Sequence, residues 1–277
     1  MFSVNRFLGN GSLPGDLNAS YGRMDPYRTA IYWRFLYEQC GGMANGVKDP
    51  AAGMQVIRQA LTVLYSGEVV DIASSTDLVG ALPGIMDRAL EGSACPFQTH
   101  KESLLAFARA IYALRLEGGR CTRPGSPAGC GLYDLNHLYV DPPLNIVNYA
   151  GAEQAYSGAI KSSFGVDFVD VVLDPTATGQ PLTLEFYPAP GAGAEFNVHL
   201  WQLADSGEGA RPQRVPGQAV PEVLTGTNAD GHLAYVIPAI NTTAYNRLGL
   251  IITRVDANEG SDPVGAYTIV LRAEIGR

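Results

Sequence analysis

The sequence predicts an α+β protein, in which an N-terminal helical bundle precedes a C-terminal antiparallel β-sandwich of the jelly-roll or immunoglobulin-like type. In the first part of the chain, apolar residues recur at steps of three and four, as on one face of a helix. In the last part they alternate with polar residues, as in a strand with one buried face. We therefore divide the chain into a helical domain (1–119), a connector (120–165) and a sandwich domain (166–277).

The first two helices have the same start signal. Asp25-Pro26 and Asp49-Pro50 each combine an N-cap residue with Pro at the first helical position. The first helix is expected to end at Gly41-Gly42, because Gly is favoured just past a helix end. The second helix has apolar residues at helical spacing, which predict its buried stripe: Met54, Ile57, Leu61 and Leu64.

Two further helices complete the predicted bundle. The third begins near Thr76, and Pro83 in its early turns should kink or delay it. The fourth begins at Thr99, which forms a capping box with Glu102, and ends at Gly118-Gly119. The apolar faces of these two helices are Leu78, Leu82, Met86 and Leu90, and Leu104, Phe107, Ile111 and Leu114.

The sandwich domain contains short strand patterns with no helical pattern between them. Gly, Pro, Asn and Asp punctuate the gaps, which is typical of turns. Strands that follow one another directly, with one apolar and one polar face, indicate antiparallel pairing. The predicted strands lie within 168–173, 182–186, 196–201, 233–237, 248–252 and 267–271.

Four cysteines bear on the compartment of the protein. Cys121 and Cys130 flank a loop rich in turn-forming residues, so a disulfide that closes this loop is sterically natural, and Cys40 would then pair with Cys95. Four cysteines allow three connectivities, and four free thiols are the alternative. Disulfides would place the protein outside the cytoplasm, secreted or at the cell surface.

Composition and motifs exclude several functions. The net charge of -8, with no cluster of Lys and Arg, argues against a nucleic-acid partner. No apolar run has the length of a transmembrane segment, and no signal peptide is visible at the start of the sequence. The four histidines, His100, His137, His199 and His232, do not form a zinc motif, and no serine-hydrolase elbow is present. We therefore expect no metal or other cofactor in this chain.

One face of a predicted strand is a candidate binding surface. Asn197, His199 and Trp201 share this face, whereas their neighbours on the other face are apolar. An aromatic ring beside polar groups could stack on a sugar or contact a partner protein. Alternatively, the neighbouring domain covers this face.

The first helix is unusually aromatic, and its sequence resembles a known enzyme superfamily. Residues 27–42 (YRTAIYWRFLYEQCGG) are similar to the helix that follows the zinc site of gluzincin-type metallopeptidases, and residues 136–142 (NHLYVDP) before the sandwich resemble secreted bacterial proteins of this type. The resemblance implies that Tyr27 occupies the position of the tyrosine that donates a hydrogen bond to the tetrahedral oxyanion. Ala30 replaces the family's Gly, and the family's upstream metal-binding motif is not in this sequence.

Two hypotheses follow. In the first, this chain is the non-catalytic C-terminal portion of a secreted metallopeptidase-like protein, inactive alone, with zinc only in an upstream peptidase domain. In the second, it is an extracellular structural or binding protein whose sandwich engages a glycan, a protein partner or copies of itself. A third hypothesis is a hydrolase with an unrecognised site.

Overall fold

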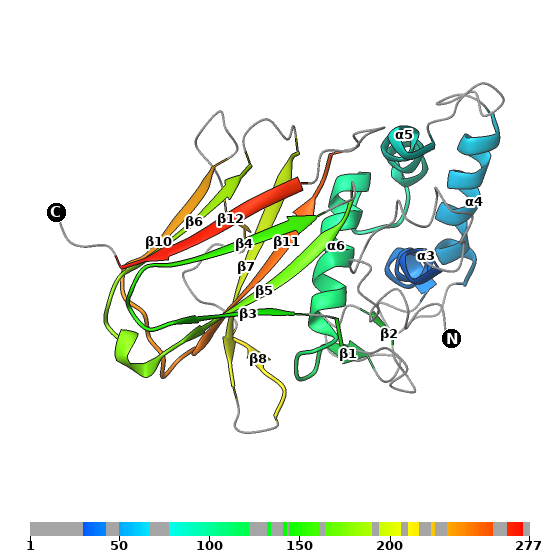
Figure 1. Ribbon diagram of the computed structural model, residues 1–277. Coiled ribbons are helices and arrows are strands. Elements are labelled where there is room, and N and C mark those ends of the chain that lie inside the picture. Colours follow the sequence, from blue (N-terminus) through cyan, green and yellow to red (C-terminus); the bar gives the residue numbers. More distant parts are fainter. Residues whose placement is uncertain are drawn as a thin grey trace.

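The protein has a helical layer at one end and two stacked β-sheets at the other (Figure 1). The computed structural model describes residues 30–42, 50–66, 78–121, 132–133, 141–142, 144–160, 164–189, 194–205, 210–215, 223–224, 232–256 and 265–273. Within these ranges one sheet has six strands and the other has four, and helix α6 lies between the six-stranded sheet and the other helices. The α+β class and the order of the two parts agree with the sequence prediction.

Each predicted helix is present in the described part of the chain. The helices are α3 (Ala30–Tyr37), which continues into the π-helical turn η1 (Glu38–Gly42), α4 (Pro50–Ser66), α5 (Leu78–Leu90) and α6 (His100–Ala113). Gly41 ends the first helical segment with a φ of 122°, a conformation that residues with a Cβ atom rarely adopt. Pro83 lies inside α5. No helix in these ranges is long and apolar enough to cross a membrane.

The buried stripe of α4 differs from the predicted one. Met54 and Leu61 are 38% and 46% exposed, whereas a neighbouring stripe of smaller residues is buried: Gly53, Val56, Ala60 and Val63. A Cβ atom on Gly53 would lie 2.6 Å from the Tyr37 carbonyl oxygen and 2.8 Å from the Tyr37 ring. The small residues therefore let α4 approach α3 closely. Both stripes have helical spacing, and the stripe of smaller residues is the buried one because it allows the closer packing.

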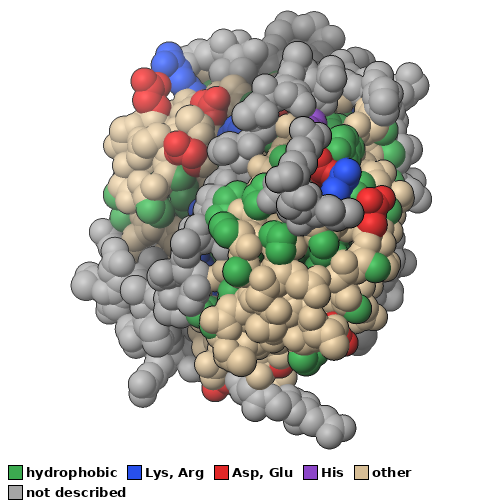
Figure 2. Space-filling model, turned by 90° about the vertical axis from the view of Figure 1, so that its left-hand side faces the viewer, with side chains coloured by type: hydrophobic (Ala, Val, Ile, Leu, Met, Phe, Trp, Pro, Cys, Tyr) green, Lys and Arg blue, Asp and Glu red, His purple; other side chains and the backbone are tan. Residues whose placement is uncertain are grey.

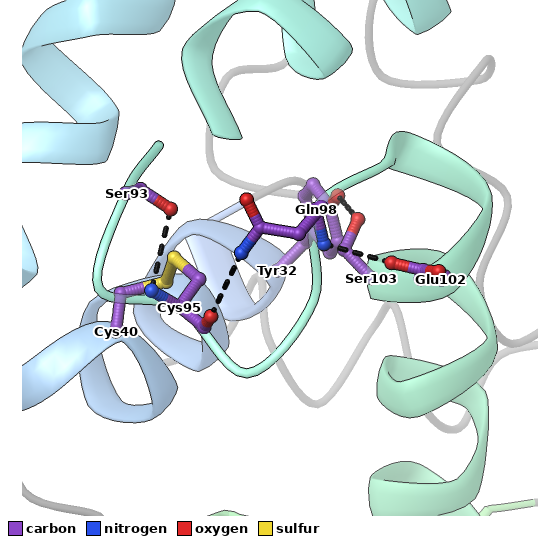
Figure 3. Close-up of a disulfide and its surroundings, with 7 residues drawn as sticks. All are labelled: Tyr32, Cys40, Ser93, Cys95, Gln98, Glu102 and Ser103. Atoms are coloured by element: carbon purple, nitrogen blue, oxygen red, sulfur yellow. Dashed lines mark hydrogen bonds between the residues drawn. A yellow bond between two sulfur atoms is a disulfide. The ribbon is translucent and has the colours of Figure 1, made fainter. Parts of the chain in front are cut away.

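A disulfide fastens the helical layer (Figure 3). Cys40 in η1 is bonded to Cys95 in the segment after α5, which is one of the predicted pairings. The segment that follows is held by hydrogen bonds from Gln98, whose side chain donates to the Cys95 carbonyl at 3.2 Å and whose backbone N–H donates to Glu102 at 2.7 Å. Cys130 and the side chain of Cys121 lie outside the described residues, so their pairing stays a prediction.

The capping box at the start of α6 is confirmed. The Thr99 side chain accepts from the Glu102 N–H at 3.2 Å, and the Glu102 carboxylate accepts from the Thr99 N–H at 3.3 Å. The predicted inner face of α6 is buried, and so are residues on its other side, including Ala108 and Tyr112. Because α6 is buried on two sides, it packs against both the other helices and the sheet.

The six-stranded sheet contains three central antiparallel strands, and one edge strand pairs parallel to its neighbour. β5 (Val166–Leu173), β11 (Arg247–Arg254) and β7 (Phe196–Ala204) pair antiparallel in that order, and β3 (Asn145–Tyr149) pairs parallel to β5. The short strands β8 (Gln213–Arg214) and β9 (Val223–Leu224) both pair with β7.

The four-stranded sheet is antiparallel throughout. Its order is β10 (Leu233–Ile237), β6 (Leu182–Pro188), β12 (Gly265–Arg272) and β4 (Gln154–Ile160). Two small elements complete the described secondary structure: the parallel pair of β1 (Arg120–Cys121) and β2 (Leu132–Tyr133), and the 3-10 turn η2 (Pro175–Ala177).

The two sheets include strands from the segment that was predicted to be a connector. β3 and β4 fall within residues 120–165, and they form edge strands of the two sheets. The strand β4 is hard to identify from its sequence because most of its residues are small or polar, and Tyr156 and Ile160 are its only large apolar side chains. An edge strand packs against fewer neighbours and therefore needs fewer large side chains.

The described hydrophobic residues form two cores, one on each side of the six-stranded sheet. One core lies between the two sheets. The other joins the helices to the outer face of the six-stranded sheet through Phe168, Trp201 and Ile251. Gly249 of β11 marks the closest approach, because a Cβ atom there would lie 1.9 Å from the Tyr112 hydroxyl oxygen. Gly249 therefore makes room for Tyr112 of α6 to lie across the sheet.

Candidate functional site

The predicted face of β7 lies beneath α6. His199 and Trp201 are 2% and 6% exposed, and Asn197 is half-buried on the same face of the strand. The Trp201 ring meets the Tyr112 ring of α6 edge to face, with ring centroids 5.5 Å apart. Of the two interpretations of this face, the structure agrees with cover by the neighbouring helical layer.

A buried carboxylate, Asp170, lies at the centre of this joint between α6 and the sheet. It is 0% exposed and faces α6 from β5. One carboxylate oxygen accepts a hydrogen bond from the Tyr112 hydroxyl at 2.5 Å. The other accepts from the guanidinium groups of Arg115 at 2.7 Å and Arg247 at 3.0 Å. Both oxygens of Asp170 therefore accept hydrogen bonds, from three donors in all.

The same network extends to Asp205, the residue that follows β7. Arg247 also donates to Asp205 at 2.7 Å, and the Arg115 guanidinium donates to the Tyr112 hydroxyl at 3.1 Å. Burial raises the pKa of Tyr112 well above its ordinary value, and the charge of Asp170 raises it further. Tyr112 therefore keeps its proton at neutral pH and donates a hydrogen bond. The network of hydrogen bonds and ion pairs holds α6 against the sheet.

Two buried histidines are neutral at physiological pH. Burial lowers the pKa of His100 to about 4, where its ring packs on Phe164 with centroids 4.7 Å apart. Burial also lowers the pKa of His199 to about 4, and the positive charges of Arg109 and Arg214 lower it further. Neither ring is exposed as a general acid or base would be, since both are 2% exposed.

A second buried carboxylate connects the two sheets. Asp167 of β5 points into the sandwich and accepts from the Tyr267 hydroxyl of β12 at 2.5 Å and from the Asn145 side chain of β3 at 3.0 Å. Burial raises the pKa of Asp167, and these hydrogen bonds oppose that rise. The cross-strand neighbour of Tyr267 is Gly158, where a Cβ atom would lie 2.3 Å from the Tyr267 hydroxyl oxygen. Asp167 therefore also has a structural role, since its hydrogen bonds join the two sheets.

The remaining predicted site residues lie elsewhere. Tyr27 and His137 are outside the described residues, so the oxyanion role that the resemblance implies for Tyr27 stays a prediction. In the part of the chain that the structure describes, His, Cys, Asp and Glu side chains do not gather in threes as a metal site would require.

The outer face of the four-stranded sheet is the surface that α6 and the other helices do not cover, since they all lie beyond the six-stranded sheet (Figure 1). Along β6 and β12, buried residues that face the core alternate with half-buried residues that face outward. The outward residues in these two strands and in β4 and β10 are mostly small or hydroxyl-bearing: Ala155, Ser157, Ala159, Thr183, Ala234, Val236, Ala266, Thr268 and Val270. Figure 2 shows the molecule from the left-hand side of Figure 1, where hydrophobic side chains spread across the middle of the described surface and charged side chains lie toward its upper left and right.

An aromatic pair interrupts this surface. The rings of Tyr187 (β6) and His232 (next to β10) are stacked, with centroids 4.4 Å apart and planes 8° from parallel. Glu185 lies on the same face of β6, with its carboxylate 3.6 Å from His232 Nε2 and in an ion pair with Arg272 of β12. We call these four residues, Tyr187, His232, Glu185 and Arg272, the aromatic shelf.

The aromatic shelf combines flat apolar surface with directional polar groups. Partial burial raises the pKa of Tyr187, and its hydrogen bond to Glu185 raises it further, so the phenol keeps its proton at neutral pH. Thr268 lies beside Tyr187 in the register of β12 and β6, and its hydroxyl is 3.4 Å from that of Ser157. A ring surface next to a carboxylate, a guanidinium and hydroxyl groups suits a flat ligand that carries many hydroxyl groups.

Sequence reasoning missed the aromatic shelf. Tyr187 and Glu185 occupy the outward positions of a clean alternating strand, which was a usable signal. His232 and Arg272 are distant in sequence, and the register of three strands brings them to the same place. The sequence pattern gave no reason to prefer this strand face over that of β7.

The fold is of the α+β class, with two stacked, sandwich-like sheets and a helical layer packed on one of them. No protein-family model matches the chain, and no curated protein matches it. Among solved structures, the chain is similar to the pre-peptidase C-terminal domain of a collagenase from Bacillus anthracis, at 11% identity and a TM-score of 0.31, over 47% of this chain and 95% of that one.

Two other solved structures have similar scores. One is a periplasmic inhibitor of g-type lysozyme from Salmonella Typhimurium, at 11% identity and a TM-score of 0.27, over 47% of this chain and 98% of that one. The other is a surface-associated copper-binding protein from Methylomicrobium album BG8, at 8% identity and a TM-score of 0.30, over 47% of this chain and 98% of that one. Similarities this low carry no argument about what this chain does.

Proposed function

We propose that this chain is a non-catalytic, extracytoplasmic binding protein that holds carbohydrate on the outer face of its four-stranded sheet. The observation that carries the proposal is the aromatic shelf, where the Tyr187–His232 stack lies beside Glu185 and Arg272. A sugar ring has an apolar face and a rim of hydroxyl groups. An aromatic ring can cover the face while a carboxylate and a guanidinium accept from and donate to the rim.

The state of the buried ionisable groups supports a non-catalytic role. Asp170 is fully buried and accepts from three donors, and Asp167 accepts from Tyr267 and Asn145. A carboxylate that acts as a base or nucleophile needs access to substrate. These two instead join α6 to the sheet and the two sheets to each other.

The disulfide supports an extracytoplasmic location. Cys40 and Cys95 are 1% and 6% exposed, and their bond joins the first helical segment to the residues after α5. Structural disulfides form and persist mainly in oxidising compartments. Carbohydrate at a cell surface or outside the cell is then available to the shelf.

Binding to a panel of soluble polysaccharides and oligosaccharides, measured by affinity electrophoresis and calorimetry, tests the proposal. We expect Tyr187→Ala to weaken binding about thirtyfold, since loss of a central aromatic anchor costs about 2 kcal/mol or more. The matched control is Tyr65→Ala, because Tyr65 is 78% exposed on α4 at the far end of the molecule. Binding that survives Tyr187→Ala, or no binding to any glycan, contradicts the proposal. Concentration-dependent sedimentation would instead indicate self-assembly.

The metallopeptidase resemblance suggests that this chain belongs to a longer polypeptide. In that version of the proposal, the chain is the non-catalytic C-terminal portion of a secreted metallopeptidase-like protein, and the shelf holds the enzyme on its substrate. We expect the native polypeptide to have an intact mass well above 29.5 kDa and to carry about one zinc ion in its upstream domain. Intact mass spectrometry and metal analysis of one sample check this. A zinc-free chain of about 29.5 kDa contradicts this version and leaves the carbohydrate proposal standing.

A further inference from the structure

Four side chains form two neighbouring contacts between α6 and β7. Arg109 and Tyr112 are one turn apart on α6, and His199 and Trp201 are two residues apart on the face of β7 that meets α6. Arg109 contacts His199, with 3.0 Å between Nη1 and Nε2, and Tyr112 contacts Trp201 edge to face. We call Arg109, His199 and Trp201 the donor cluster.

The contact with Arg109 fixes the tautomer of His199. A guanidinium has only N–H donors, so Nε2 of His199 must accept the hydrogen bond and carry a lone pair. The proton of the neutral ring is then on Nδ1. This Nδ1–H is buried and lacks a hydrogen-bond acceptor in the described part of the chain.

Trp201 contributes a second donor of the same kind. Its indole Nε1–H can only donate, it is buried, and no described residue accepts from it. Buried polar groups in folded proteins nearly always have a partner, so two such donors on one strand face require an explanation. An acceptor that is not part of the described chain would satisfy both.

The charges around the donor cluster have the sign that such an acceptor needs. Arg109 is half-buried, and within the described ranges it forms no ion pair with a carboxylate. Arg214 of β8 lies over the Trp201 ring, with its Cζ 4.4 Å from the centroid. Burial lowers the pKa values of both arginines, and Arg109 lowers that of Arg214 further, so the two positive charges are close enough to repel. An anion beside Arg109 would lower the cost of burying its charge.

We propose that the donor cluster binds a small oxyanion between α6 and β7. Arg109 supplies the charge, and His199 Nδ1–H and Trp201 Nε1–H donate hydrogen bonds to its oxygens. The ligand class is a carboxylate or a tetrahedral oxyanion such as phosphate or sulfate. The site lies on the opposite side of the six-stranded sheet from the aromatic shelf, so it is independent of the carbohydrate proposal.

Fluorescence of Trp201 tests this inference directly. The chain has two tryptophans, so Trp33→Phe leaves Trp201 as the only indole reporter. We titrate this variant with sodium phosphate, sodium sulfate or sodium acetate at neutral pH, and hold ionic strength constant with sodium chloride. A saturable change with acetate assigns a carboxylate site, and one with phosphate or sulfate assigns a tetrahedral oxyanion site.

Charge variants identify the residues that bind. Arg109→Gln should raise the apparent Kd at least tenfold, whereas Arg88→Gln, which removes an exposed arginine of α5, should leave it unchanged. If Arg109→Gln does not fold, the indole N–H resonance of Trp201 in the Trp33→Phe chain gives a second readout, and it should shift downfield on binding. A response to all salts equal to that of chloride, or an unshifted indole resonance, overturns the inference.

Discussion

Asp170→Asn is expected to lower the free energy of unfolding by about 3–5 kcal/mol, because removing one partner of a buried ion pair leaves uncompensated charge behind. Here the charge left behind is the guanidinium group of Arg115, whose side chain is 10% exposed, whereas Arg247 keeps its ion pair with Asp205. Urea denaturation followed by tryptophan fluorescence measures the change, and Trp201 lies next to the network through Tyr112.

The matched control for Asp170→Asn is an exposed ion pair that also connects the helices to the sandwich. Lys101 of α6 pairs with Glu195 at 2.6 Å, but the two side chains are 52% and 63% exposed. Lys101→Gln should therefore cost less than about 1 kcal/mol. Equal urea midpoints for Asp170→Asn and the wild type would contradict the central role that we assign to Asp170.

Loss of the Cys40–Cys95 disulfide is the second large effect that we expect. The bond closes a loop with a sequence separation of 55 residues. Loop-closure entropy for that length corresponds to about 4 kcal/mol, within the observed range of about 2–5 kcal/mol for native disulfides. The double variant Cys40→Ala, Cys95→Ala should unfold at a correspondingly lower urea concentration, and reductant should lower the midpoint of the wild type in the same way.

The double variant also reports on the other cysteine pair. If Cys121 and Cys130 are free, reductant should not change the stability of the double variant. Any remaining sensitivity to reductant assigns a second bridge to them. Unchanged stability of the wild type with and without reductant would contradict the Cys40–Cys95 contribution.

Local sequence signals predicted the elements that depend on local interactions. The capping box of Thr99 and Glu102 marks the start of α6, and Gly41 marks the end of the first helical segment. Six strand patterns in the last part of the chain correspond to β5, β6, β7, β10, β11 and β12. These signals depend only on residues a few positions apart, so they can be recognised without knowing which distant segments pack together.

Features that depend on distant partners were not predictable in this way. Asp170 occupies a strand that is apolar apart from Asp170 and Asp167, and its partners Tyr112 and Arg247 are 58 and 77 residues away. The face of β7 with His199 and Trp201 has the alternation of a half-solvated strand, but α6 buries it. Alternation shows that a strand has two different faces, and it does not show what covers each one.

The placement of α6 has a consequence for how the protein can be divided. A cut near residue 119, between the predicted helical and sandwich parts, separates α6 from the sheet that it covers. The released sandwich would expose Phe168, Trp201 and Ile251 to water and leave Asp170 without Tyr112 and Arg115. The smallest autonomous piece that retains the aromatic shelf therefore includes α6, and a useful truncation would begin before Thr99 and not after Gly119.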